Sequence, residues 1–300
     1  MIKSLVTGGA GFIGSNLVDR LLSLGHEVIC IDNEFADNEI FYWNKKAKNF
    51  KLDITKYDEI KGLFKSVDYV FHMAAESRIG PSIQNPQKAF EINILGTTNV
   101  LQCSRENNIK RLVYSSTSSG YGLNNLPNIE TQLDDCLNPY SVSKISAEKI
   151  CKMYSDFYNL PTIIFRYFNV YGERAPTKGQ YAPVIGIFLR QKKEGQKLTV
   201  TGDGEQKRDF IYIDDVVEAN IRAALKQIDK KYLGQIFNVG SGKNISIKNI
   251  AKMISQDIEY LPERQGEVKA TLADIKKIKS VLDWNPKMNL ENWIKKYTNQ

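Results

Sequence analysis

A glycine-rich turn near the N-terminus constrains the fold of this chain more than any other feature of its sequence. Gly8, Gly11 and Gly14 directly follow a β-branched segment, residues 4–7, and open an amphipathic helical pattern over residues 12–24. At such a strand-to-helix turn, backbone amides at the helix N-terminus can approach a pyrophosphate without obstruction from side chains. The pattern therefore predicts the first turn of a dinucleotide-binding βαβ unit, and a tight turn that binds no ligand is the alternative.

Strand and helix patterns alternate through the first half of the 300-residue chain. Helical stripes cover residues 87–107 and 141–158. Further short strand patterns lie at residues 27–31, 69–71, 111–114 and 162–166. This rhythm is typical of a parallel sheet with helices on both faces. We therefore expect an α/β fold, in which residues 1–166 form a Rossmann-type doubly wound parallel sheet that binds a dinucleotide.

The pattern loosens after about residue 167 into a loop over residues 172–182, a turn at residues 201–204 and shorter elements. We expect residues 167–300 to form a smaller C-terminal α/β domain that holds the substrate. No linker composition marks the boundary, and some later strands, such as residues 235–239, are candidates for packing back onto the first sheet.

Composition argues against several other classes of protein. The formal net charge of +7 comes from lysines that are dispersed and mixed with acids, so a solvated surface explains it better than nucleic-acid binding does. A positive field would also favour capture of an anionic nucleotide. The four cysteines show no CxxC spacing and the histidines are only His26 and His72, which disfavours both a disulfide framework and a metal centre.

The sequence also lacks the signals of membrane insertion and export. No run of about 18 apolar residues occurs, and the N-terminus shows neither a basic region nor a cleavage site. We therefore expect a cytoplasmic protein that has no membrane or nucleic-acid partner and no bound metal.

An acid ends the second predicted strand. Asp32 lies where a carboxylate can accept hydrogen bonds from the adenosine ribose hydroxyls, and it would repel a 2′-phosphate, so the sequence favours NAD over NADP. Asn33 beside it keeps a simple strand-ending turn open as the alternative. Asp53 and Ile54, after the next short strand, are candidates for bordering the adenine ring, although a surface turn fits that pair nearly as well.

A tyrosine and a lysine one helical turn apart are the candidates for chemistry. Tyr140 and Lys144 share a face of the predicted helix, so the ammonium can favour the phenolate and can also hold the nicotinamide ribose. Thr117 follows the strand pattern at residues 111–114 and can share a proton with a substrate hydroxyl. Each feature has a plain alternative: an amphipathic surface pair for the first two and an ordinary Ser/Thr-rich loop for the third.

Several motifs together resemble the extended short-chain dehydrogenase/reductase family, and in particular its UDP-hexose 4-epimerases. They occur in the family's order: TGGAGFIGSN (7–16), HMAA (72–75), SSTSSGYG (115–122), YSVSK (140–144), RYFNVYG (166–172), RDFIYIDD (208–215) and RQGEVKATLAD (264–274). The resemblance implies a bound NAD and a UDP-sugar substrate. It assigns the cofactor to these residues: Gly8, Gly11, Phe12, Ile13, Gly14, Asp32, Asn33, Asp53, Ile54, Ala74, Ala75, Tyr140 and Lys144.

The resemblance also bears on the reaction and the substrate. Related 4,6-dehydratases and decarboxylases keep acidic residues directly after the catalytic hydroxyl, whereas this chain has Ser118 and Ser119, which favours epimerisation at carbon 4. The alternative within the family is another nucleotide-sugar conversion, such as UDP-glucuronate 4-epimerisation or keto-sugar reduction. A non-catalytic NAD-binding regulator is the alternative outside the enzymes.

Five residues match the family's nucleotide-sugar contacts, and they are Asn169, Arg208, Arg264, Glu267 and Thr271. The resemblance implies that the asparagine and the arginines hold phosphate, and that the glutamate holds the uridine ribose. The small Thr271 would border the 2-substituent of the sugar and admit an N-acetyl group. We expect UDP-N-acetylhexosamines to be accepted, and UDP-glucose and UDP-galactose are further candidates. The family habit of pairing two helices per subunit, here residues 87–107 and 141–158, implies a homodimer.

Overall fold

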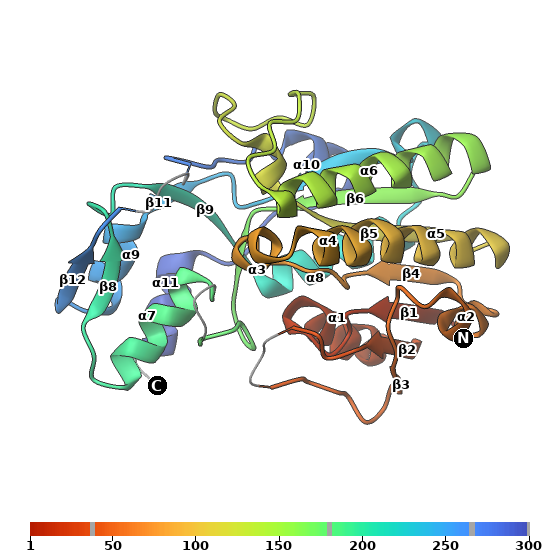
Figure 1. The fold of residues 1–300 in the computed structure, drawn as a ribbon, viewed down its shortest axis with the longest axis horizontal. Helices are drawn as coiled ribbons and strands as arrows, with labels where there is room; N and C mark the ends of the chain where they lie inside the picture. Colours follow the sequence, from red (N-terminus) through yellow and green to blue (C-terminus); the bar gives the residue numbers. More distant parts are fainter. Residues whose placement is uncertain (37–39, 179–181, 264–267, 299–300) are drawn as a thin grey trace.

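The chain folds around a seven-stranded sheet in which every neighbouring pair of strands is parallel (Figure 1). This computed structural model describes residues 1–36, 40–178, 182–263 and 268–298. The strand order is β10-β6-β5-β4-β1-β2-β3. The strands are β1 Lys3–Thr7, β2 Glu27–Asp32, β3 Lys48–Lys51, β4 Tyr69–His72, β5 Arg111–Thr117, β6 Thr162–Tyr167 and β10 Gln235–Val239. The expected doubly wound parallel sheet is confirmed.

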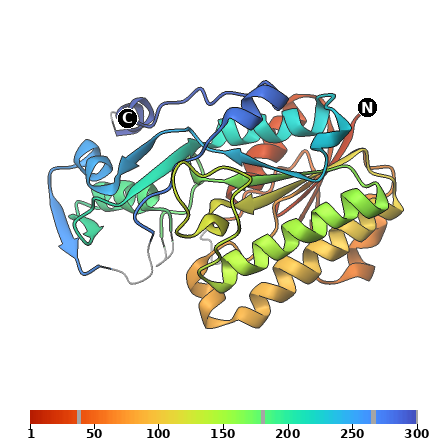
Figure 2. The same ribbon diagram turned by 90° about the horizontal axis from the view of Figure 1, so that it is seen from above.

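Helices cover both faces of this sheet (Figure 2). One layer contains α1 Phe12–Ser23, α8 Ile213–Leu225 and α10 Lys276–Leu282, and the other contains α2 Tyr57–Ile60, α5 Thr97–Glu106 and α6 Pro139–Tyr158. Successive strand residues point to opposite layers, since Leu5 packs in one hydrophobic core and Val6 in the other. Burial on both faces explains the apolar runs of inner strands, such as residues 28–31 in β2 and 163–165 in β6.

Short helical segments link the central elements. They are the 3₁₀ turns at Lys61–Phe64, Ser118–Tyr121 and Lys230–Tyr232, together with α3 Ile79–Gln84, α4 Pro86–Phe90 and the π-helical segment Glu91–Gly96. The single helix expected over residues 87–107 is therefore interrupted by a π-helical turn. That turn carries the buried side chain of Asn93, which hydrogen bonds to the backbone of Glu76, and it packs Gly96 against Ile54.

The second half of the chain builds a smaller unit at one end of the sheet. Its sheets are β11-β9-β7 and β12-β8, made from β7 Asn169–Tyr171, β8 Leu198–Thr201, β9 Lys207–Tyr212, β11 Asn244–Ser246 and β12 Ile258–Leu261. The helices α7 Val184–Lys193, α9 Ile247–Ile254 and α11 Leu290–Thr298 pack around a third core. Between these elements, β10 returns to pair with β6 of the central sheet, so residues after 166 contribute to both units.

Within the described residues, no helix has the length and apolar character needed to cross a membrane. The same residues contain no group of three or more histidine, cysteine, aspartate or glutamate side chains placed to hold a metal ion.

Candidate active site

One large cleft collects the candidate residues that the sequence singled out. It has a volume of about 1130 Å³ and lies at the carboxyl ends of the parallel strands, where ligands of open α/β sheets bind. Its walls include Gly8, Gly11, Phe12, Ile13, Gly14, Asp32, Asn33, Asp53, Ile54, Ala74, Ala75, Thr117, Tyr140, Lys144, Asn169, Arg208 and Thr271. Arg264 and Glu267 lie outside the described residues.

The glycine turn forms one end of the cleft because no larger residue fits its backbone path. Gly8 has a positive φ of 66° and donates its N–H to the carbonyl of Ile31 at 2.7 Å. A Cβ atom on Gly14 would lie 2.1 Å from the carbonyl oxygen of Gly8. Helix α1 then begins at Phe12, and no side chain caps its first N–H groups. These amides and the positive end of the helix dipole fit a pyrophosphate.

The buried carboxylate of Asp32 lies beside this turn at the end of β2. It accepts the N–H of Ala10 at 3.1 Å and the N–H of Glu34 at 2.8 Å, and burial raises its pKa. Asp53 accepts a hydrogen bond from Asn33 at 3.2 Å and two from Thr55, so its carboxylate also shapes its own turn. Asp32 thus lies beside the glycine turn but also shapes the turn that follows β2, so both Asp32 and Asp53 fit either of the two alternatives that the sequence leaves open.

A chain of hydrogen-bonded, buried polar groups holds the backbone at Ala74 against the glycine turn. The ring of His72 lies 2.7 Å from the hydroxyl of Thr7 and 2.9 Å from that of Thr97, and the Thr7 hydroxyl accepts the N–H of Ala74. Burial, together with the charge of Lys144, lowers the pKa of His72 to about 3. His72 is therefore neutral and has a structural role. Ala74 approaches so closely that a Cβ on Gly8 would lie 2.6 Å from its nitrogen.

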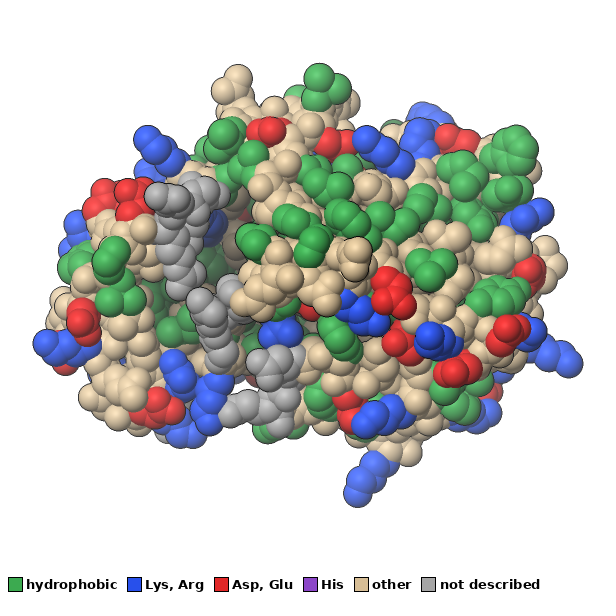
Figure 3. Space-filling view, viewed as in Figure 1, with side chains coloured by type: hydrophobic (Ala, Val, Ile, Leu, Met, Phe, Trp, Pro, Cys, Tyr) green, Lys and Arg blue, Asp and Glu red, His purple; other side chains and the backbone are tan. Residues whose placement is uncertain are grey.

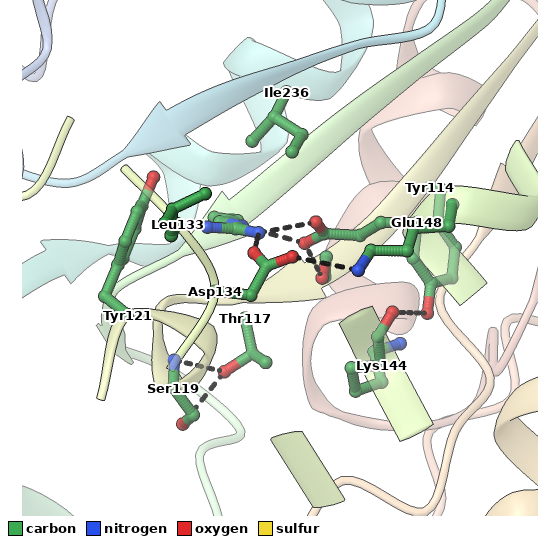
Figure 4. Close-up of polar contacts among 12 residues, drawn as sticks. Tyr114, Thr117, Ser119, Tyr121, Leu133, Asp134, Lys144, Glu148 and Ile236 are labelled. Atoms are coloured by element: carbon green, nitrogen blue, oxygen red, sulfur yellow. Dashed lines mark hydrogen bonds and ion pairs between the residues drawn. The ribbon is translucent and has the colours of Figure 1, made fainter. Parts of the chain in front are cut away.

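The three catalytic candidates come from β5 and from the first turns of α6. Thr117 is the last residue of β5, and its hydroxyl accepts the N–H of Ser119 at 3.1 Å and lies 3.1 Å from the Ser119 hydroxyl (Figure 4). Helix α6 begins at Pro139 because Asn138 and Ser141 form a capping box. Tyr140 and Lys144 therefore lie one turn apart on one face of this helix, as the sequence predicts.

The pKa shifts of Tyr140 and Lys144 differ in one respect from what the sequence predicts. Burial raises the pKa of Tyr140, the hydroxyl of Thr117 lowers it, and the charge of Glu76 raises it further. Lys144 is 3% exposed, and its ammonium lies 4.3 Å from the ring centroid of Tyr114. Burial lowers the pKa of Lys144 to about 7. Thr117 is thus the neighbour whose hydrogen bond lowers the pKa of Tyr140, whereas the ammonium of Lys144 lies over the ring of Tyr114.

A buried ion pair behind Thr117 was not anticipated from the sequence. Arg166 on β6 donates to both carboxylate oxygens of Glu148 on α6, at 2.9 and 2.7 Å, and to Asp134 at 2.6 Å (Figure 4). The Glu148 carboxylate also accepts the hydroxyl of Ser116 at 2.5 Å. The pair therefore joins β5, β6 and α6 next to the catalytic candidates. Arg166 belongs to a quoted motif, but its partners are too distant in sequence to infer.

A second unanticipated residue, Asp209, links the residues expected to hold the nucleotide. Its carbonyl accepts the side-chain amide of Asn169 at 2.9 Å, and its N–H donates to the hydroxyl of Thr271 at 3.2 Å. Its carboxylate is fully buried and accepts hydrogen bonds from Ser241 N–H and hydroxyl and from the N–H groups of Gly242 and Ala273. Arg208 precedes it on β9. Only the arginine was singled out, since arginine suits phosphate directly.

Comparisons with known proteins agree with this geometry. The NAD dependent epimerase/dehydratase family matches residues 4–240. A UDP-glucuronate 4-epimerase from Thermodesulfobacterium geofontis is 36% identical, with 98% of this chain and 94% of the relative covered.

Two solved structures superimpose on nearly the whole chain. The UDP-glucose 4-epimerase of Thermotoga maritima, solved with UDP-glucose, has a TM-score of 0.93 at 33% identity and covers 99% of this chain and 98% of its own. The UDP-N-acetylglucosamine 4-epimerase of Methanobrevibacter ruminantium M1 has a TM-score of 0.92 at 32% identity, with 99% and 97% covered.

Proposed function

The chain belongs to the NAD dependent epimerase/dehydratase family, and we propose that it interconverts the carbon-4 epimers of UDP-N-acetylhexosamines and of UDP-hexoses. It is an NAD-dependent isomerase of the UDP-sugar 4-epimerase type. One observation carries the proposal: Thr117, Tyr140 and Lys144 share a cleft with the glycine turn and with the residues grouped around Asp209.

The glycine turn, the free amides of α1 and the carboxylate of Asp32 fit the cofactor, and NAD bound there supplies the hydride acceptor and donor for carbon 4. Tyr140 takes the proton of the sugar 4-hydroxyl, directly or through Thr117, and later returns it. Lys144 holds the nicotinamide ribose. Asn169, Arg208, Arg264 and Glu267 hold the UDP while the hexose turns between its two faces. The protein thereby orients a 4-keto sugar and shields it from water.

Epimerisation fits the residues near the catalytic hydroxyl better than elimination does. Removal of a proton from carbon 5 needs an additional acid or base, but the residues after Thr117 are Ser118 and Ser119. Ser119 is already hydrogen bonded to Thr117. The proposal therefore restricts the chemistry to carbon 4.

The choice of hexose rests on Thr271. Its hydroxyl accepts the N–H of Asp209, and the side chain lines the cleft without the bulk of an aromatic residue. This leaves room for an N-acetyl group at carbon 2. The Methanobrevibacter enzyme, which is named as a UDP-N-acetylglucosamine 4-epimerase, is consistent with this choice.

We also propose a homodimer that pairs residues 87–107 and 141–158 of each subunit. Hydrophobic side chains gather over α5 and α6 in Figure 3. Phe157 and Met153 of α6 are 74% and 42% exposed, and Leu95 in the π-helical segment before α5 is 47% exposed. Apolar patches of this kind mark contact surfaces. Sedimentation at micromolar concentration is expected to give twice the chain mass, and a monomer mass would contradict the proposal.

Substrate trials test the function directly. The purified protein, without added cofactor and then with NAD, is incubated separately with UDP-N-acetylglucosamine and UDP-glucose while anomeric NMR signals are followed. We expect galacto products from both, and none with Tyr140→Phe. Product from UDP-glucose alone would contradict the role of Thr271, and product from neither would contradict the proposed function.

A further inference from the structure

An arginine in the wall of the cleft has no role in the mechanism above. Arg78 lines the cleft next to Ser77 and Ile79, with its side chain 22% exposed. Its Nε lies 3.7 Å from a carboxylate oxygen of Glu76, which is within ion-pair range but too long for a hydrogen bond. Within the described part of the chain, its guanidinium donates no hydrogen bond to another protein group. Its planar N–H fork is therefore available to a ligand.

The segment that carries Arg78 is rigidly attached to the catalytic helix. Asn93, in the π-helical turn, accepts the N–H of Glu76 at 2.8 Å and donates to its carbonyl at 2.9 Å. The same amide group donates to the hydroxyl of Ser143 at 2.8 Å, and Ser143 donates to the carbonyl of Tyr140 at 2.8 Å. Asn93 and Ser143 are almost completely buried. This continuous chain fixes the Glu76 segment relative to Tyr140.

Glu76 also shows which end of the cleft the arginine occupies. The chain through Asn93 and Ser143 joins its backbone to Tyr140, and its charge acts on the Tyr140 phenol, so Glu76 lies at the end of the cleft next to the catalytic helix. The Glu76 carboxylate accepts the N–H of Arg78 at 3.2 Å, which holds the start of α3 against it. Arg78 therefore lines the same cleft as Tyr140, and its guanidinium is a candidate to reach a hexose whose 4-hydroxyl lies at Tyr140.

We propose that Arg78 is a specificity-determining residue that binds a carboxylate on the hexose, so that the enzyme also accepts UDP-hexuronates. This inference rests on the proposed function. A guanidinium fork matches a carboxylate with two parallel hydrogen bonds, and it does so better than it matches a single hydroxyl. Because Glu76 faces the Nε edge, the two terminal nitrogens can serve the sugar while Glu76 keeps the arginine oriented.

A different role for Arg78 would be to neutralise Glu76 and thereby tune Tyr140. The two roles have different consequences. Loss of a substrate contact affects acidic sugars selectively, whereas loss of neutralisation raises the pKa of Tyr140 and slows every substrate in the same way, with a shift of the pH profile toward higher pH.

The experiment compares the wild type with Arg78→Gln, Arg78→Lys and the control Arg20→Gln, which removes an exposed arginine from α1. The kcat/KM values for UDP-glucuronate and UDP-glucose are measured across pH, and the binding of both nucleotides to the NAD-loaded proteins is measured by calorimetry. We expect Arg78→Gln to lose roughly 10- to 100-fold in kcat/KM and affinity for UDP-glucuronate only. Arg78→Lys should recover part of this loss, and Arg20→Gln should match the wild type.

The other outcomes overturn the inference. Equal losses for both substrates with a shifted pH profile would assign Arg78 to Tyr140 instead, and wild-type protein that neither binds nor converts UDP-glucuronate would exclude the carboxylate site. Wild-type protein that converts neither sugar would contradict the proposed function. The contact between Arg78 and the sugar carboxylate would still be supported in that case if Arg78→Gln selectively lost UDP-glucuronate binding. Thermal unfolding of each variant checks that it is folded.

Discussion

The guanidinium of Arg166 and the carboxylate of Glu148 form a two-hydrogen-bond ion pair directly behind Thr117, where Arg166 is 1% exposed and Glu148 3%. Loss of Glu148 leaves the buried guanidinium with the partly exposed Asp134 as its remaining carboxylate partner among the described residues. We expect Glu148→Gln to lower the free energy of unfolding by up to about 3–5 kcal/mol and to reduce kcat, because Ser116 beside Thr117 also loses its charged acceptor.

Urea unfolding checks this prediction, with Glu218→Gln as the matched control. Glu218 pairs with Arg222 one turn along α8, and both side chains are about one-third exposed. This control should lose about 0–1 kcal/mol. Equal losses of unfolding free energy in the two variants would show that the buried ion pair stabilises the fold no more than the exposed pair does.

Lys144 is needed for the proposed chemistry, but its burial should lower the stability of the folded protein. Burial lowers its pKa to about 7, whereas a lysine in an unfolded chain titrates near 10.4. The unfolded state therefore binds more protons between about pH 7 and 10, so stability rises with pH across that window. We expect Lys144→Met to be inactive but more stable than the wild type, by on the order of a few kcal/mol near neutral pH and by less near pH 10.

Urea unfolding of the cofactor-free proteins at about pH 6.5 and 9.5 measures this difference. A variant that is less stable than the wild type at the lower pH would mean that contacts of the lysine, including its position over the Tyr114 ring, outweigh the cost of its burial.

Asp209 should act on substrate binding rather than on chemistry. Its carboxylate orders the backbone of residues 241, 242 and 273, and its own backbone holds Asn169 and Thr271. We expect Asp209→Asn to raise KM for the UDP-sugar at least about tenfold with a smaller change in kcat, because a neutral amide cannot accept all these donors. The control Asp203→Asn changes an exposed turn acid outside the cleft.

Calorimetry with UDP alone shows whether Asp209→Asn weakens nucleotide binding specifically or unfolds the protein in general. Weaker UDP binding with unchanged NAD binding supports a positioning role for this residue. A parallel loss of NAD binding would instead indicate general unfolding.

Gly14→Ala should prevent cofactor binding. The added Cβ would lie 2.1 Å from the Gly8 carbonyl oxygen, a contact that forces the turn open. Gly62→Ala is the matched control, because nothing lies within 4 Å of the corresponding Cβ. We expect NAD titration to show binding lost in the first variant and retained in the second. Wild-type affinity in Gly14→Ala would refute the assignment of the turn.

Local patterns made the cofactor end of the site predictable. The glycine turn occupies one strand-to-helix junction, and Tyr140 and Lys144 lie on one turn of one helix, so each signal sits within a few residues. The parallel order of the sheet followed from the same local alternation of strands and helices.

The other contacts of the site could not be predicted from the sequence, because they join residues that lie far apart in the chain. Arg166 meets Asp134, which is 32 residues away, and Asp209 meets Ala273, which is 64 residues away. No periodicity within either segment indicates these partners. The position of the Lys144 ammonium over the Tyr114 ring could not be predicted for the same reason, since it depends on how α6 packs on β5 rather than on helix spacing.

In the proposed mechanism, hydride leaves carbon 4 and returns to the same carbon on the opposite face. UDP-glucose carrying deuterium at carbon 4 tests it, with the product followed by NMR in ordinary water. We expect UDP-galactose that retains the deuterium at carbon 4. Product in which solvent hydrogen has replaced the deuterium would contradict it.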